Sequence, residues 1–210
     1  MITFYDCSTA PSPRRARILL AEKGVAHDTV QVDLRTGEQL SDAFRQINPA
    51  CTVPALKTDS GLVLTDNAAI AAYLEAQFPA LPLFGMTPEE KAEIASWNWR
   101  VEFEGLLAIA EALRNSSPAM KDRALPGPVN YPQIPELAQR GLARVQQFFL
   151  TLNERLAGRD YIATDRFSIV DITAVVTVDF ARVVKVKVDE QYPHLQRWRA
   201  AMAQRVSMSL

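Results

Sequence analysis

The sequence has few side chains able to hold a metal ion or form a disulfide bond. Its 210 residues include only two cysteines, Cys7 and Cys51, and two histidines, His27 and His194. The cysteines form no Cys-x-x-Cys pair and the histidines lie far apart, whereas a structural zinc site needs about four ligands. We therefore expect no bound metal and, in a reducing compartment, no structural disulfide.

Strong charge and long apolar runs are also missing. Lys and Arg number 23 and Asp and Glu number 24, so the net charge is -1 and no basic field is available for nucleic acid. No apolar run reaches the roughly 18 residues that a membrane-spanning helix needs. Residues 1–6 lack the pattern of a secretory signal. We expect a cytoplasmic protein that binds neither nucleic acid nor membrane.

The chain does have enough apolar residues for a substantial core, at 48% of the total. Its pattern changes near residues 78–83, where Pro79 and Pro82 are typical of a linker. Before this point, short strand-like and helical runs alternate in the order β-α-β-α-β-β-α, which predicts a small α/β sheet domain. After it the pattern is almost wholly helical. We predict a first domain over residues 1–80, a linker over 81–88 and an all-helical domain over 89–210.

In the second half, Thr87 and Pro88 begin a long helix that should end near residue 114. Residues 118–135 contain five prolines and are predicted to form a loop. A second long helix is expected over 136–156. Its inward stripe is predicted to be Leu142, Val145, Phe149 and Leu152.

Ser168 and Asp171 have the spacing of a capping box, in which each side chain bonds the other residue's backbone N–H. The helix that they open, from Ile169 to about residue 184, is apolar on most of its faces and is therefore expected to be buried. A last helix should begin at Pro193.

Three segments of the first half carry candidate chemistry: residues 7–15, 48–56 and 64–70. In the second of these, local sequence alone favours a trans Val53-Pro54 bond, because only about 5% of such bonds are cis. In the third, Asp66 is a good N-cap for the following helix. The same helix start could bind a ligand carboxylate, while Asp66 pairs with an ammonium group.

Together these segments resemble the cytosolic glutathione transferase superfamily, with features of its bacterial, theta-like and nu-like members. The resemblance covers nearly the whole chain in order. The matching stretches are residues 34–44, 48–56, 64–74, 168–171 and 192–198. It implies a thioredoxin-like N-terminal domain followed by a helical bundle. It also implies a detoxifying transferase that activates the glutathione thiol for conjugation to an electrophilic apolar substrate.

The resemblance implies a role for each matching residue of the first domain. A cis bond before Pro54 would let the Val53 backbone pair with the cysteinyl part of glutathione. Asp66 and Asn67 would hold the γ-glutamyl ammonium and carboxylate, although Asn67 replaces the serine that is usual in the family. Gln39 falls on a position that contacts the glycyl carboxylate in theta-like members. Cys51 stands where glycine is common, which we interpret as a packing substitution.

The catalytic position departs from the family pattern. Ala10 aligns with the usual serine and cannot activate a thiol. Ser12 is the first candidate, because it lies just before the predicted helix over residues 13–23 and could act both as N-cap and as thiol ligand. Thr9, Ser8 and Cys7 are the alternatives.

The second substrate is expected between the two halves, near Trp99, Phe103 and Tyr131, although helical spacing also fits core or dimer contacts. The family implies a homodimer, with glutathione as co-substrate and no prosthetic group. Two other functions stay open. One is a glutathione-dependent disulfide reductase, and the other is a non-catalytic interaction module, which the departures at Ala10 and Asn67 favour. Glutathione binding would separate the module from both enzymes.

Overall fold

The computed structural model describes residues 1–210 and divides the chain into two compact units. The first comprises Met1–Leu81, Leu125–Asn130 and Leu210, and the second comprises Pro82–Ala124 and Tyr131–Ser209. Part of the proline-rich loop, Leu125–Asn130, therefore groups with the first unit, although its place in the sequence put it in the second domain. No helix is both long enough and apolar enough to cross a membrane.

The first unit is a four-stranded mixed sheet with helices. Its elements are β1 (Thr3–Asp6), α1 (Pro11–Glu22), β2 (Asp28–Gln31), η1 (Glu38–Leu40), α2 (Asp42–Arg45), β3 (Ala55–Lys57), β4 (Val63–Leu64) and α3 (Asn67–Gln77). The strand order is β2-β1-β3-β4, with β1 parallel to β2 and antiparallel to β3, and with β3 antiparallel to β4. The predicted β-α-β-α-β-β-α order is confirmed, and the unit is thioredoxin-like.

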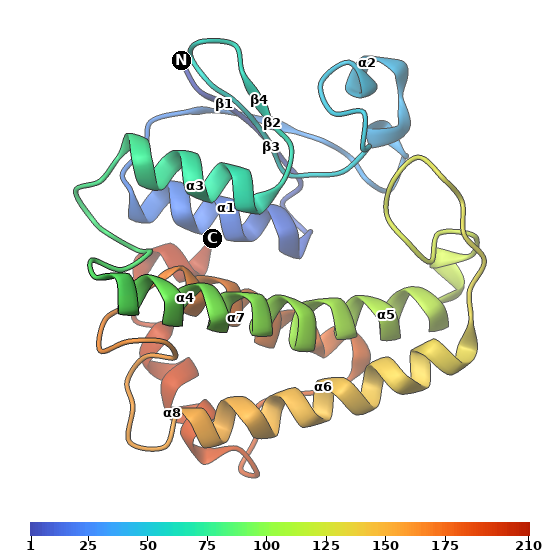
Figure 1. Ribbon diagram of the computed structural model, residues 1–210. Coiled ribbons are helices and arrows are strands. Elements are labelled where there is room, and N and C mark those ends of the chain that lie inside the picture. The colour runs from blue at the N-terminus through green and yellow to red at the C-terminus, as the bar shows by residue number, and fades with distance from the viewer. The chain divides into compact units, whose positions relative to one another are not determined.

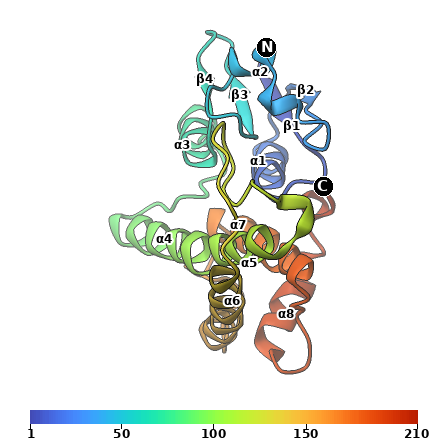
Figure 2. The same ribbon diagram turned by 90° about the vertical axis from the view of Figure 1, so that its right-hand side faces the viewer.

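Side-chain alternation along β1 explains where the helices pack. Phe4 is fully buried, and α1 and α3 lie side by side along one face of the sheet (Figures 1 and 2). Tyr5 points to the opposite face, because successive strand residues alternate. Its ring meets Phe44 of α2 edge to face at 6.2 Å. The helix α2 therefore packs on the face that α1 and α3 leave open.

The second unit is all-helical. Its elements are α4 (Pro88–Arg100), η2 (Val101–Leu106), α5 (Leu107–Ser116), η3 (Pro118–Met120), α6 (Pro135–Arg155), α7 (Ile169–Phe180), η4 (Ala181–Val184), α8 (Pro193–Met202) and η5 (Val206–Ser209). The predicted long first helix is present, but η2 forms a π-helical segment in its middle. Thr87 and Glu90 form a capping box at its start. The predicted all-helical bundle is confirmed.

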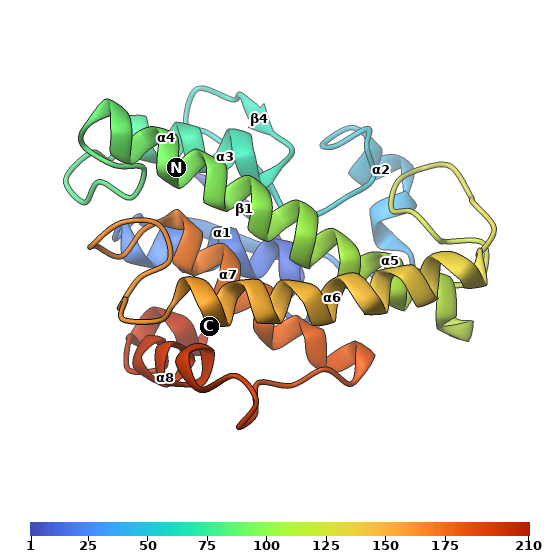
Figure 3. The ribbon, with the colours of Figure 1, turned by 60° about the horizontal axis from the view of Figure 1, so that its bottom comes forward.

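Helices α5 and α6 pack closely, side by side (Figure 3). Gly141 allows this approach, because an added Cβ would lie 2.7 Å from the Ala112 backbone nitrogen and 2.8 Å from the Ala108 carbonyl oxygen. On the same helix Val145 and Phe149 are fully buried, as predicted. The prediction for Leu142 is wrong: its side chain is 37% exposed, on the side of the helix away from the core.

The predicted burial of the following helix is confirmed, since every residue of α7 from Ile169 to Val178 is buried. The capping box at its start is present, with Asp171 accepting from the Ser168 N–H at 3.0 Å. The same carboxylate accepts from the Ile162 N–H at 3.2 Å and from Trp198 Nε1 at 3.1 Å. Burial raises the pKa of Asp171 to about 6, although these hydrogen bonds oppose the rise.

Candidate functional site

The first loop joins β1 to α1 and carries the candidate thiol-activating residues. The helix begins at Pro11, with Ala10 at its N-cap and no side-chain cap. The prediction that Ser12 caps the helix is therefore wrong, because Pro11 takes the first helical position that proline favours. Ser12 lies one residue further inside the helix. Its side chain is half-buried, and its hydroxyl has no hydrogen-bond partner within the chain.

Cys7 and Thr9 lie together at the start of this loop. The Cys7 side chain is buried and its Sγ is 3.5 Å from Thr9 Oγ1. Ser8 and Thr9 are exposed. Both cysteines of the chain are free thiols. Ser8, Thr9 and Ser12 thus present hydroxyl groups at the surface of the loop, whereas the Cys7 thiol is buried.

The Val53-Pro54 bond is cis, as the family resemblance implied and contrary to the reading from local sequence alone. Val53 lies just before β3, and neither its N–H nor its C=O has a hydrogen-bond partner within the chain. Its side chain packs in an apolar cluster with Cys7, against which Ala10 also packs. The first loop and the unpaired backbone of Val53 are therefore neighbours.

The start of α3 offers a negatively charged carboxylate and the partial positive charge of unpaired backbone N–H groups. Asp66 is the N-cap, and its Oδ1 accepts from the Ala69 N–H at 2.8 Å. Its side chain is exposed and Oδ2 makes no hydrogen bond, so one carboxylate oxygen remains available. Asn67 is the first helical residue, and its backbone N–H is one of the donors that a helix start leaves unpaired. Such an arrangement can bind a carboxylate beside an ammonium group.

Two further residues of the first unit have unusual environments. Gln39 lies in η1, and its Oε1 is buried without a hydrogen-bond partner. Buried amide groups normally have one, so this oxygen can still accept a hydrogen bond. Cys51 is buried and has a φ of 55°, in the left-handed region that favours glycine. Backbone conformation, and not packing alone, therefore explains why glycine suits this position.

Of the three residues expected to line the second-substrate site, the structure brings two together. The rings of Trp99 and Phe103 stack with centroids 4.9 Å apart, and their side chains are 58% and 46% exposed. The Arg144 guanidinium lies 4.9 Å from the Phe103 ring centroid. Tyr131 is exposed and contributes its backbone to a bridge with Arg123. No ring contact joins Tyr131 to the stacked pair.

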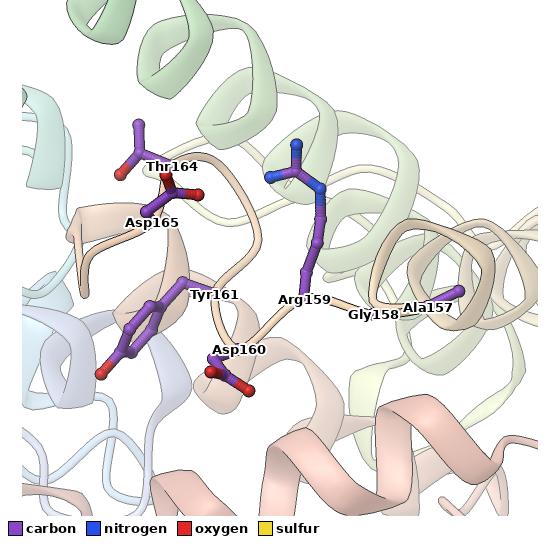
Figure 4. A pocket seen from close by; sticks show the side chains of 7 residues that line it. All are labelled: Ala157, Gly158, Arg159, Asp160, Tyr161, Thr164 and Asp165. Atoms are coloured by element: carbon purple, nitrogen blue, oxygen red, sulfur yellow. The ribbon is translucent and has the colours of Figure 1, made fainter.

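A separate hollow of about 560 Å³ lies in the second unit, after α6 (Figure 4). It is open and polar, and its lining residues are Ala157, Gly158, Arg159, Asp160, Tyr161, Thr164 and Asp165. None of the predicted site residues lines it. No group of three or more His, Cys, Asp or Glu side chains is arranged to hold a metal ion.

Comparisons with known proteins show the family to which this chain belongs. The model of the family "Glutathione S-transferase, N-terminal domain" matches residues 9–77, and that of "Glutathione S-transferase, C-terminal domain" matches residues 117–205. Glutathione S-transferase 2 of Saccharomyces cerevisiae is 33% identical over 97% of this chain and 86% of its own length. The chain belongs to the glutathione S-transferase family.

Solved structures of other glutathione S-transferases match the fold over almost their full length. A glutathione S-transferase domain-containing protein of Marinobacter aquaeolei has a TM-score of 0.89 and 34% identity, covering 98% of this chain and 99% of its own. Gtt2 of Saccharomyces cerevisiae has a TM-score of 0.88 and 32% identity, covering 99% and 98%. The N-terminal family match includes Ser12, Gln39, Val53 and Asp66, the residues predicted to face glutathione.

Sequence reasoning missed one group of residues beside the first loop. Asp6, Arg17 and Gln31 form a hydrogen-bonded cluster directly beneath the first loop. These residues lie on β1, α1 and β2, and no spacing rule relates a residue of an edge strand to a residue of a helix. Only the parallel pairing of β1 with β2, which sets Asp6 beside Gln31, brings them together.

Proposed function

We propose that this chain is a glutathione transferase that binds glutathione on its thioredoxin-like unit and presents the thiolate to an electrophilic apolar compound. The observation that carries the proposal is the backbone of Val53, whose two polar groups are unpaired beside the first loop. An extended peptide can pair with such a backbone. A cysteinyl residue placed there would direct its sulfur toward the loop from Ser8 to Ser12.

The remaining groups fit the two ends of glutathione. The free oxygen of Asp66 suits the γ-glutamyl ammonium, and the N-terminus of α3 at Asn67 suits the γ-glutamyl carboxylate. The Nε2 group of Gln39, unlike its unpaired Oε1, can donate to the glycyl carboxylate. Each part of the tripeptide then has a partner of complementary charge or hydrogen-bonding character.

Thiol activation falls to the hydroxyl of Ser12, with Thr9 as the alternative. Lowering a thiol pKa from about 8.5 to about 6.5 requires about 2.7 kcal/mol. One hydrogen bond to a charged group supplies about 1.5–3 kcal/mol, and a helix N-terminus adds about 0.3–1 kcal/mol. One hydroxyl at the start of α1 is therefore sufficient without a general base.

The stacked Trp99 and Phe103 rings offer apolar surface to the electrophile. The proposed active form is a homodimer in the cytoplasm.

Calorimetric titration with glutathione tests the proposal, using the wild type and Asp66→Asn. Asparagine caps a helix as well as aspartate does, so this variant keeps α3 intact while removing the charge that faces the ammonium group. We expect wild-type binding with a Kd of about 1 mM or tighter and binding at least about tenfold weaker in the variant. Absence of binding to the wild type would refute the proposal and favour an interaction module.

Ser12→Ala and Thr9→Ala then identify the activating group. The ultraviolet absorbance of the bound thiolate is followed against pH, and conjugation to a chlorodinitrobenzene is compared with reduction of a small disulfide. The pKa of the bound thiol should rise in the Ser12 variant and stay unchanged in the Thr9 variant. The reverse result would assign activation to Thr9. Disulfide reduction without conjugation would replace the transferase by a reductase.

A further inference from the structure

A buried carboxylate lies under the first loop and is fully paired. The Asp6 side chain is 3% exposed. Arg17 donates to it with two nitrogens, Nε to Oδ2 at 3.0 Å and Nη2 to Oδ1 at 2.9 Å. Gln31 Nε2 donates to Oδ2 at 3.0 Å. Asp6 thus fixes the orientation of one side chain from α1 and one from β2.

The Arg17 and Gln31 side chains also form hydrogen bonds with one and the same peptide group. Arg17 Nη2 donates to the Cys7 carbonyl oxygen at 3.3 Å, and the Ser8 N–H donates to Gln31 Oε1 at 3.1 Å. The Cys7 carbonyl and the Ser8 N–H are the two polar ends of a single planar peptide unit. That unit is therefore held at both ends, and both contacts depend on Asp6.

The orientation of the Cys7–Ser8 peptide determines which backbone N–H groups of the first loop remain available to a ligand. The Ser8 N–H is used by Gln31, and the Ala10 N–H donates to the Cys7 carbonyl at 3.0 Å. Pro11 and Pro13 have no N–H. Within residues 8–13, the backbone N–H groups without an acceptor are those of Thr9 and Ser12, two of the three residues whose hydroxyls are candidates for thiol activation.

We propose that Asp6, Arg17 and Gln31 are positioning residues, which hold the Cys7–Ser8 peptide so that the donors of Thr9 and Ser12 face the glutathione sulfur. This inference rests on the proposed function. The Arg17 guanidinium also balances the charge of Asp6, so the buried carboxylate does not oppose formation of a thiolate nearby.

Gln31→Ala tests the proposal without changing any charge. Gln31 is exposed on an edge strand, so the variant is expected to fold. Thr29→Ala is the matched control, because Thr29 lies two residues earlier on the same face of β2, is exposed and makes no side-chain hydrogen bond. Three quantities are measured: hydrogen exchange of the Ser8 amide, the pKa of the bound glutathione thiol, and the pH profile of conjugation.

In Gln31→Ala the Ser8 amide should exchange at least about fivefold faster, because its only acceptor is gone. The pKa of the bound thiol should rise by about one unit toward the value of about 8.5 for a free thiol. Conjugation should then fall by up to about tenfold below that pKa and recover at high pH. The KM for glutathione should change little, because Val53, Asp66 and Gln39 are untouched. Thr29→Ala should match the wild type throughout.

The two proposals fail in different ways. A Gln31→Ala protein with faster Ser8 exchange but with the thiol pKa and pH profile of Thr29→Ala would overturn the positioning role, while the transferase proposal would stand. A rise in KM alone, with no change in thiol pKa, would also overturn it. A wild type that binds no glutathione, or binds it with an ordinary thiol pKa, would refute the proposed function and this inference with it.

Discussion

We expect removal of the Asp171 side chain to destabilise the second unit more than removal of any other polar side chain. Asp171→Ala would leave four buried donors without their acceptor: the N–H and the hydroxyl group of Ser168, the N–H of Ile162 and Nε1 of Trp198. Each buried unpaired donor costs about 1–3 kcal/mol, so we expect a loss of at least about 4 kcal/mol at pH 7. Because whole proteins are stable by only about 5–15 kcal/mol, this loss would bring the chain close to unfolding.

Asp171→Asn should cost less, about 2 kcal/mol, because its amide oxygen still accepts two bonds while its NH2 group faces the Ser168 N–H. The measurement is urea-induced unfolding, followed by far-ultraviolet circular dichroism. Asp165→Ala is the control, since Asp165 is exposed and makes no side-chain hydrogen bond, and it should lie within about 0.5 kcal/mol of the wild type. A loss below about 1 kcal/mol in Asp171→Ala would refute the reasoning.

The pH dependence of the same variants checks the charge state. Burial raises the pKa of Asp171 from 3.8 to about 6, so between these pH values the folded state holds a proton that the unfolded state has lost. Raising the pH through this window therefore favours unfolding, by up to about 3 kcal/mol in total. Asparagine does not titrate. The stability of the wild type relative to Asp171→Asn should accordingly fall between about pH 4 and pH 6, and a rise would contradict the pKa assignment.

Two further substitutions test the packing and the backbone. Gly141→Ala should destabilise the protein by about 2 kcal/mol in urea unfolding, because the added Cβ would meet the backbone of Ala112 and Ala108. This loss should exceed the gain from the higher helix propensity of alanine. An unchanged or higher urea midpoint would mean that α5 and α6 can separate without cost. Lys185→Gly should raise Tm by about 2–4 °C, because Lys185 is exposed and has a left-handed φ of 63° that costs a side chain about 1 kcal/mol. A lower Tm would show that the lysine side chain contributes more than its backbone costs.

The order of elements was predictable because the local signals were consistent. Alternation and turn residues indicated a sheet domain before residue 78, and helical periodicity with capping signals indicated helices after it. Ser168 and Asp171 were identified as a capping box from spacing alone, and the structure shows both of its hydrogen bonds. The prediction for Leu142 was wrong because helical spacing gives a stripe but not its width, which depends on how closely the neighbouring helix approaches.

The candidate site was predictable only in part. Local sequence already indicated Asp66 as an N-cap that could pair with an ammonium group, whereas Gln39 and the cis bond at Val53-Pro54 came from the family resemblance. The roles of all three toward glutathione remain predictions. Local sequence alone favoured a trans bond at Pro54, and the structure has a cis bond. For Ser12, a good N-cap residue followed by proline suggested the wrong helix start, because Pro11 competes for the same position.

By itself, then, the sequence determined the quantities that depend on neighbours along the chain: the periodicity of each element, the capping boxes and the family to which the chain belongs. The tertiary structure alone decided which distant groups meet. The parallel pairing of β1 with β2 sets Asp6 beside Gln31, and α1 adds Arg17, so that one buried carboxylate orients the Cys7–Ser8 peptide. Hydrogen bonds act over about 3 Å in space, and separation along the sequence carries no information about that distance once the chain has folded.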